Sequence, residues 1–259
     1  MDNVGPYDNR ITAFIDILGF SRDVKAISGH PGLLLSINAV LSHLLKCKGD
    51  LDRARQSRGV KHDARMTCFS DCVVLSYNAE AGAALRAIAD AAFVGRVLLA
   101  GGYLPRGVIT VGPLVHTEGI IFGDALIEAA KEEECRVDTP RIKLMPAFAT
   151  ILKAELAEHR DDGRDFFQDR GDGPFVHILG SRWPFVRKER EDRVRQGIGG
   201  NHIDDLYSEM HDALPVRFKN APHERARNKI RWICDYINDA ISEQGLSPRY
   251  KVDLGDIRE

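Results

Sequence analysis

The 259-residue sequence predicts an α+β fold, in which a ferredoxin-like core of order β-α-β-β-α-β is followed by an α-rich appendage. Two observations support this expectation. Apolar runs of strand length alternate with segments of helical period over residues 10–150, and two of these runs meet at a tight turn. After about residue 150, the strand pattern gives way to charged segments. We therefore expect two parts, residues 1–150 and residues 151–259, with the second packing on the first.

The first predicted strand covers residues 11–18, where only Thr12 and Asp16 interrupt an apolar run. Such a run is typical of a central strand, so Asp16 is a carboxylate in an otherwise buried element. A helix is predicted over residues 31–47, because leucine, isoleucine and valine recur there at helical spacing and Gly49 follows as a stop.

Two β-prone segments, residues 65–71 and 72–77, meet at small, turn-tolerant residues, which predicts a hairpin with Asp71 at its turn. A helix over 80–100 and a strand over 107–115 follow, separated by a Gly-Gly pair that breaks the helical period. In the ferredoxin-like arrangement, the helices cover one face of the sheet.

The pattern continues with a helix over 124–134, a strand over 142–145 and a helix over 147–158. A polar loop rich in Gly and Asp comes next, and then a charged stretch over 186–196. A last helix is predicted from four isoleucines that align at helical spacing, Ile230, Ile233, Ile237 and Ile241.

Composition limits the classes of function. The net charge of -2 disfavours a dedicated nucleic-acid-binding protein, because affinity for the phosphate backbone requires a basic surface. Five cysteines without a CxxC pair indicate neither a disulfide framework nor a zinc site, and they predict a reducing, cytoplasmic location. The sequence shows no leader and no apolar run of membrane-spanning length, so no membrane contact is expected.

Asp16 and Asp71 are candidate metal ligands. If their strands pair, the two carboxylates converge, and no Arg or Lys close to them in sequence compensates their charge. Hard divalent cations bound between the two carboxylates are the simplest way to neutralise their mutual repulsion. The alternatives are a helix-capping role for Asp16 and a turn role for Asp71.

Gly19 allows a sharp turn of the backbone after Asp16. Such a turn exposes backbone amides at the start of the next helix, and exposed amides there can bind phosphate. The sequence contains no P-loop and no GxGxxG motif that would bind phosphate instead.

Three blocks, FIDILGFS, FSDCVVLS and RGVITVGPLVHTEGIIFGDALIEAAKEEE, resemble the catalytic core of class III nucleotidyl cyclases and occur in that family's order. The resemblance spans about residues 10–140. It is closer to the pyrimidine cyclases of bacterial Pycsar antiphage systems than to adenylate or guanylate cyclases. The later segments TPRI and NKIRWICDYIND add to this likeness.

The resemblance implies a site with two divalent metal ions, Mn²⁺ or Mg²⁺. It assigns the metals to the carboxylates of Asp16 and Asp71 and to the carbonyl of Ile17. It assigns the triphosphate to backbone amides in the segment Leu18, Gly19, Phe20 and Ser21. An enzyme of this family is a homodimer with its active sites at the interface.

The sequence departs from the family pattern where purine cyclases select their base, since those positions are Thr67 and Ile120 here. Arg65 and Thr67 are candidates for reading a pyrimidine. The family's helical Asn and Arg are replaced by Ile127 and Lys131. Lys131 is therefore a candidate for the cation that stabilises the transition state, although it lacks the bidentate fork of Arg.

Arg106 and Arg141 are further candidates for that cation, with ordinary surface solvation as the alternative. Two other features are expected to be structural. Glu132 to Glu134 are interpreted as a solvated helix face, and His116 as a polar residue at a strand end.

The expected activity is the conversion of UTP into 3′,5′-cyclic UMP and pyrophosphate, as the signal-producing step of antiphage defence, with a cyclic-nucleotide-responsive effector as indirect partner. Conversion of CTP into cyclic CMP is the nearest alternative. A second alternative is a cyclase-like domain that binds a nucleotide without turnover, motivated by the replaced Asn and Arg positions. Both metal aspartates argue against it.

Overall fold

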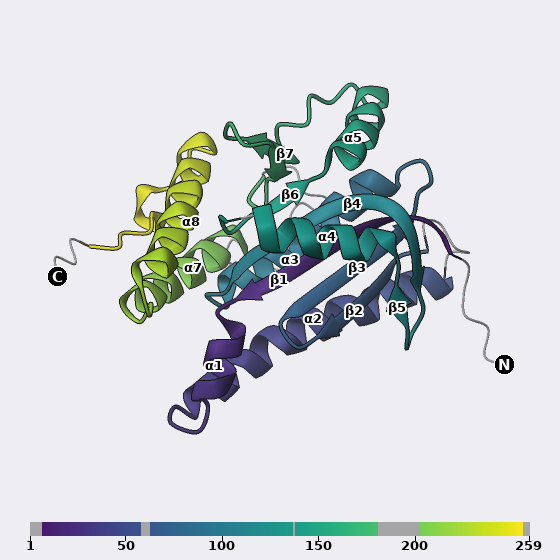
Figure 1. Cartoon of the computed structure of the whole chain (residues 1–259). Helices are drawn as coiled ribbons and strands as arrows, with labels where there is room; N and C mark the ends of the chain where they lie inside the picture. Colours follow the sequence, from purple (N-terminus) through teal and green to yellow (C-terminus); the bar gives the residue numbers. More distant parts are fainter. Residues whose placement is uncertain (1–6, 58–62, 137, 181–201, 256–259) are drawn as a thin grey trace.

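The computed structural model describes residues 7–57, 63–136, 138–180 and 202–255 (Figure 1). Its first four strands lie side by side in the order β2-β3-β1-β4, and every neighbouring pair is antiparallel. This is the ferredoxin-like arrangement predicted from the sequence, and the α+β fold class is confirmed. The four strands are β1 (Asp8–Leu18), β2 (Arg65–Phe69), β3 (Cys72–Asn78) and β4 (Leu104–His116).

The sheet continues beyond β4 into the C-terminal half of the chain. Strand β6 runs parallel to β4, β8 pairs with β6, and β7 pairs with β8, while the short β5 pairs with the end of β4. The polar Gly/Asp-rich loop expected after residue 158 therefore contains two strands. These elements are β5 (Ile121–Phe122), β6 (Ile142–Leu144), β7 (Phe167–Asp169) and β8 (Pro174–Val176).

Helices cover both faces of the sheet. Figure 1 shows α4 (Asp124–Arg136) across one face, with α2 (Gly32–Ser57) and α3 (Ala83–Ala100) on the other. The odd-numbered residues of β1 from Ile11 to Ile17 join the large core beneath α2 and α3, and Phe14 joins a small core beneath α4. The expectation of helices on one face is right for α2 and α3 and wrong for α4, because the second face of the sheet is also apolar at its centre.

The last helices pack into the same large core. The isoleucines predicted to align in α8 (Glu224–Glu243) are buried, and α7 (His202–Lys219) contacts α3. The side chain of Arg96 in α3 donates hydrogen bonds to the carbonyls of Ile178 and Gly180, at 2.6 and 3.2 Å. The chain also forms α5 (Pro146–Glu158) and a 3₁₀ turn, η1 (Pro248–Tyr250). The division at residue 150 stays a prediction.

Several element bounds differ from the sequence expectation. Strand β4 begins at Leu104, three residues early, because it pairs with β1 along the whole of that strand. A short helix, α1 (Phe20–Ala26), follows Gly19 directly. The charged stretch over 186–196 lies outside the described residues. Within the described residues, no helix combines the length and apolarity needed to cross a bilayer.

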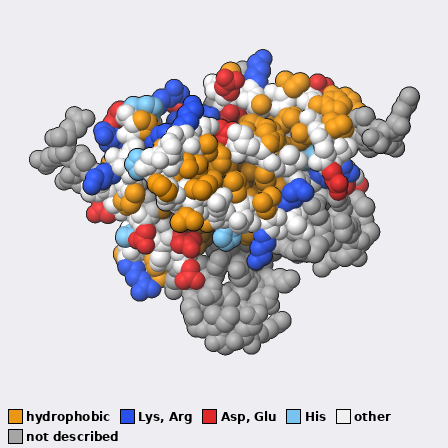
Figure 2. Space-filling model, turned by 90° about the horizontal axis from the view of Figure 1, so that it is seen from below, with side chains coloured by type: hydrophobic (Ala, Val, Ile, Leu, Met, Phe, Trp, Pro, Cys, Tyr) orange, Lys and Arg blue, Asp and Glu red, His pale blue; other side chains and the backbone are white. Residues whose placement is uncertain are grey.

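Figure 2 shows hydrophobic side chains gathered over the middle of the face seen from below Figure 1, where α1 and α2 lie. The exposed large hydrophobic residues of these two helices are Val24, Leu34, Leu35 and Leu45. Other residues of α2, such as Ile37, Val40 and Leu44, are buried in the large core, so the apolar surface of α2 extends beyond its buried side.

A carboxylate from α5 caps the start of α3. Gly82 precedes α3 and offers no side chain to accept the first helical amides. The buried Glu155 supplies that acceptor, because its carboxylate receives hydrogen bonds from the amides of Gly82 at 2.9 Å, Ala84 at 3.3 Å and Leu85 at 2.9 Å. The negative charge also lies at the positive end of the helix dipole.

We predict that Glu155→Ala lowers the free energy of unfolding by about 2–3 kcal/mol, since it leaves buried helix amides without an acceptor. Urea unfolding followed by circular dichroism measures the loss. Glu158→Ala, an exposed position on the same helix, is the matched control and should change stability by less than about 0.5 kcal/mol. Equal stability of the two variants would contradict the capping role.

Candidate functional site

The candidate site lies where the central strand β1 ends. Asp16 pairs in register with Cys72 of β3 on one side and with Arg106 of β4 on the other. Its side chain shares the α4 face of the sheet with Phe14, because alternate residues of a strand point to the same side. The Asp16 side chain is 18% exposed, so the carboxylate is largely withdrawn from water yet still reachable.

Asp71 reaches the same place from the β2–β3 turn. Ser70, the residue before it, adopts a positive φ of 51°, which makes the turn tight. The Ile17 amide donates to the Asp71 carbonyl at 2.7 Å, and the Ser21 hydroxyl donates to the Asp71 carboxylate at 2.6 Å. The hairpin is thus held against both the end of β1 and the start of α1.

The two carboxylates converge as the sequence predicts. An oxygen of Asp16, an oxygen of Asp71 and the sulfur of Cys72 all lie within 4.8 Å of one another. Burial raises the pKa of Asp16, although the Arg106 guanidinium opposes the shift. The Ser21 hydrogen bond lowers the pKa of Asp71. Asp71 is therefore the carboxylate that stays ionised to lower pH.

The donors at this point fit a hard divalent cation. Two carboxylates together with nearby backbone carbonyls are the oxygen ligands that Mg²⁺ and Mn²⁺ prefer. Burial and the neighbouring carboxylates raise the pKa of Cys72 to about 12, so its sulfur remains a protonated thiol and a poor ligand. Asp16 and Asp71 would hold the metal.

Arg106 changes the charge balance expected from the sequence. Nothing close in sequence compensates Asp16, but the fold brings the Arg106 guanidinium within 3.1 Å of its Oδ2. Arg106 also forms an ion pair with Glu133 of α4. A carboxylate has lone pairs on both oxygens, so Asp16 retains acceptor capacity on Oδ1. The expected repulsion is partly relieved by the protein itself.

Glu132 and Glu133 do not form the solvated helix face expected from the sequence. They are 8% and 6% exposed, and they pair with Lys143 and Arg106 respectively. Burial raises the pKa of Glu133 to about 7. Both residues follow Ala125 and Ala129 at helical spacing, and this spacing puts them on the buried side of α4. Glu134 is exposed, as expected.

The loop after Asp16 has the sharp turn predicted for it. Gly19 has φ +89°, a left-handed conformation that favours glycine, and α1 begins at the next residue. Phe20 is buried against Tyr103, with ring centroids 6.0 Å apart, and this contact anchors the loop to the core. The amides of Leu18 to Ser21 stay proposed phosphate ligands.

The other two cation candidates lie apart from the carboxylate pair. Lys131 is exposed on α4 and, within the described residues, forms no ion pair with Asp16 or Asp71. Arg141 is buried and forms a bidentate ion pair with Asp172. Of the three candidates, Arg106 is the one that the fold places at Asp16.

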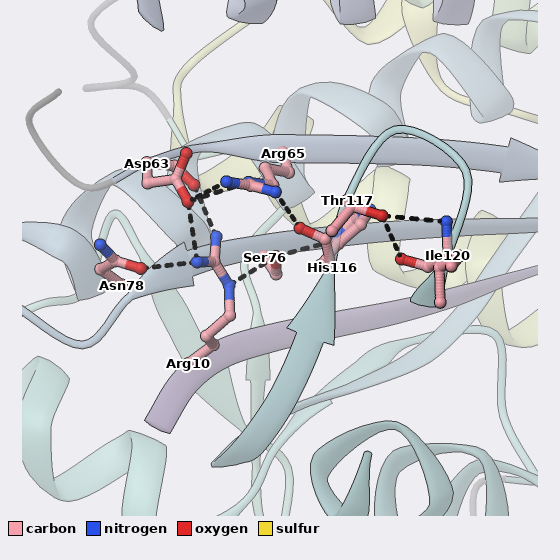
Figure 3. A network of polar contacts seen from close by, with 8 residues as sticks. All are labelled: Arg10, Asp63, Arg65, Ser76, Asn78, His116, Thr117 and Ile120. Carbon is pink, nitrogen blue, oxygen red and sulfur yellow. Dashed lines mark hydrogen bonds and ion pairs between the residues drawn. The ribbon is translucent and has the colours of Figure 1, made fainter. Parts of the chain in front are cut away.

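The base-recognition candidates belong to a polar network that Figure 3 shows from close by. Arg65 bonds to Asp63 at 2.9 Å and to the carbonyl of His116. His116 is the polar residue at the end of β4, as expected, and it is 4% exposed. Its two ring nitrogens lie 2.8 Å from the hydroxyls of Thr67 and Ser76. The network ties the end of β4 across β2 and β3.

Ile120 lies at the tip of the β4–β5 hairpin and is 47% exposed. Thr117 holds this tip, because its hydroxyl accepts from the Ile120 amide at 3.1 Å and donates to the Ile120 carbonyl at 3.2 Å (Figure 3). His116 pairs in register with Ile121, so Arg65 and Thr67 contact the hairpin next to its turn, one residue from Ile120.

Sequence reasoning missed the C-terminal contribution to this region. Arg217 of α7 forms an ion pair with Asp23 of α1 at 2.8 Å, and its guanidinium lies 4.3 Å from the Tyr103 ring centroid. A side chain at Gly19 would lie 2.9 Å from Arg217 Nη1. No local sequence signal links positions so far apart along the chain.

No protein-family model and no curated protein matches the chain. Among solved structures, it is similar to the crystal structure of the catalytic core of a rhodopsin-guanylyl cyclase with converted specificity, in complex with ATPalphaS. The two are 15% identical, and the similarity covers 65% of this chain and 92% of the other, with a TM-score of 0.39. This is a loose likeness of architecture, so the site residues are interpreted from their own geometry.

We predict that Asp71→Asn weakens Mn²⁺ binding about tenfold or more, because it removes one of two anionic ligands while keeping the side-chain shape. Electron paramagnetic resonance of free Mn²⁺ measures the affinity. Asp212→Asn, at an 82% exposed position, is the control. Indistinguishable affinities in the two variants would rule out Asp71 as a ligand.

A second prediction concerns pH. The unfolded chain loses the Glu133 proton near pH 4.5, whereas the folded chain keeps it up to about pH 7. Folding stability attributable to Glu133 therefore falls as the pH rises through this window. Relative to the wild type, Glu133→Gln should gain about 2–3 kcal/mol between pH 5 and pH 8.

Urea unfolding at the two pH values, with chelator present, measures this change. Glu134→Gln is the matched control, because its exposed neighbour position should show no comparable dependence. If the stability difference between Glu133→Gln and the wild type is the same at both pH values, the raised pKa is refuted.

Proposed function

We propose that the chain is a metal-dependent nucleotide cyclase that converts a pyrimidine nucleoside triphosphate into its 3′,5′-cyclic monophosphate and pyrophosphate. The preferred substrate in this proposal is UTP. The observation that supports this most is the convergence of Asp16 and Asp71 beside a sharply turned loop, with Ser21 of that loop bonded to Asp71. Carboxylates for metals and amides for phosphates thus occur within one short stretch of structure.

The chain's residues divide the work of this reaction as follows. Asp16 and Asp71 would hold the cations, and the amides of Leu18 to Ser21 would bind the triphosphate, which would orient the ribose 3′-hydroxyl toward the α-phosphorus. Bound divalent ions activate the attacking hydroxyl and offset the charge of the leaving group. Pinning of the Asp71 hairpin by Ile17 and Ser21 keeps the two carboxylates at a fixed separation.

Arg106 is the favoured cation for stabilising charge at the α-phosphate. It lies at Asp16, is 18% exposed and is bound to Glu133, whose raised pKa means that near neutrality this glutamate is only partly ionised. A partly neutralised partner leaves Arg106 with positive charge to offer a phosphate. Lys131 remains the alternative if a second subunit brings it to the site.

A homodimer is part of the proposal. Large hydrophobic side chains are exposed on β2, the β4–β5 hairpin and α4, namely Phe69, Ile120, Phe122 and Ile127. Phe69 shares the face of the sheet that bears Asp16, since it pairs with Cys72 in register. A second copy covering these residues would bury them and place its own residues near the carboxylate pair.

Pyrimidine selection is proposed for Arg65, Thr67 and Ile120. The Thr67 hydroxyl and the His116 ring can exchange donor and acceptor roles, which is the property needed to read the edge of uracil or cytosine. The role of the cyclic product as a cytoplasmic signal to an antiphage effector rests on the resemblance of the three sequence blocks.

Purified protein incubated with each of the four nucleoside triphosphates and Mn²⁺ should yield cyclic UMP, detected by mass, as the main product. Asp71→Ala should lower the rate roughly 100-fold or more, because one metal ligand is lost. Asp212→Ala should leave the rate unchanged.

Cyclic CMP as the main product would support the cytidylate alternative. Metal-dependent binding of a nucleoside triphosphate, without a cyclic product from any of the four nucleotides, would support the alternative of a nucleotide-binding domain without turnover. Undiminished turnover by Asp71→Ala would refute the roles given to the carboxylate pair.

A further inference from the structure

A pocket of about 510 Å³ lies beside the carboxylate pair, between the β1–α1 loop, the start of β4 and the beginning of α8. Gly19 and Arg106 belong to its wall, so it adjoins Asp16 on the β4 side. Its opposite wall comes from α8 and the turn before it, which are about 200 residues further along the chain.

The charge of this pocket is unbalanced. Among the described residues that line it, five are Arg or Lys and one, Glu134, is acidic. Arg22 and Arg217 share the single carboxylate of Asp23, at 3.0 and 2.8 Å. Arg106 is paired with Asp16 and with Glu133. The other four cations of the wall have only Asp23 and Asp138 as ion-pair partners among the described residues, so their positive charge is only partly neutralised.

The α8 wall shows the same shortage of anions. Arg225 and Lys229 share Asp138, at 2.7 and 3.8 Å, and this aspartate is itself 70% exposed. Lys229 is only 16% exposed. Burial lowers the pKa of Lys229, and the nearby Arg106 guanidinium lowers it further. An anion in the pocket would relieve this cation–cation repulsion.

The pocket also faces the first turn of a 20-residue helix. His223 caps α8 by accepting from the Ala226 amide at 3.1 Å, and the helix dipole adds positive potential at this end. Cations from α1, β4, α7 and α8 thus converge with a helix N-terminus on one cavity.

We propose that this pocket binds the terminal phosphates of the nucleotide and then the pyrophosphate that leaves, with Arg225 and Lys229 of α8 as phosphate-binding residues. The nucleotide part of the proposal rests on the proposed cyclase function. The pocket adjoins the turned loop at Gly19 and the cation at Asp16, so a polyphosphate whose α-phosphate lies at the carboxylate pair can extend into it. The C-terminal helices then take part in substrate binding.

Inorganic pyrophosphate is the probe, and calorimetric titration with the full chain measures its affinity. The double variant Arg225→Met, Lys229→Met should bind pyrophosphate about tenfold more weakly or worse, since it loses two charge-assisted contacts. Arg231→Met on the same helix removes an exposed cation that does not line the pocket and should bind as the wild type does.

Lys229→Arg, which keeps the charge, should retain most of the affinity and separates a charge effect from a packing effect. Thermal unfolding confirms that each variant is folded. Equal affinity of the double variant and Arg231→Met would overturn the proposal, as would absence of pyrophosphate binding by the folded wild type.

Turnover separates this proposal from the proposed function. If UTP or CTP is cyclised, the double variant should raise KM about tenfold, with a smaller change in kcat. Cyclisation with an unchanged KM would overturn the nucleotide assignment and leave the cyclase function intact. If no nucleotide is cyclised, but the double variant loses pyrophosphate, the anion pocket stands and the cyclase function falls.

Discussion

Strand β1 is hydrogen-bonded on both sides, to β3 and to β4, and the geometry of the site follows from that double pairing. A strand with two partners cannot slip by one residue, because a slip would turn its apolar side chains from the core to the opposite face. The register therefore fixes Asp16 between Cys72 and Arg106. The Asp71 hairpin and the Gly19 loop lie at the same end, so they meet the carboxylate where the strand stops.

The charges around Asp16 form a chain rather than an isolated pair. Asp71 is stabilised as an anion by Ser21, Asp16 is stabilised by Arg106, and Arg106 is shared with a glutamate that titrates near neutrality. Such a chain keeps a buried anion tolerable before any cation binds. It also links the charge at the carboxylate pair to α4, through Glu133.

Much of the core was predictable, because its signals are local. The apolar run around Asp16, the turn residues at Asp71 and the leucine and isoleucine stripes each lie within one element. The helix over residues 124–134 was predicted, but its place on the second face of the sheet was not, and neither were the buried Glu133 and the cations of α7 and α8. Glu133 was misjudged from its charge although its helical spacing indicated burial. Tertiary packing alone brings Arg217 to the Gly19 loop and Lys229 to the wall of the same pocket, and such packing leaves no short-range signal in the sequence.

The ion pair between Asp23 and Arg217 joins positions 194 residues apart. A chain is synthesised from its N-terminus, so β1 and the Gly19 loop emerge well before α7 and α8, which carry their cationic partners. A nascent or prematurely terminated chain would display the aspartates without the basic wall that faces them. The site therefore cannot be assembled until α7 and α8 have been synthesised, so the order of translation sets the order in which its charges are brought together.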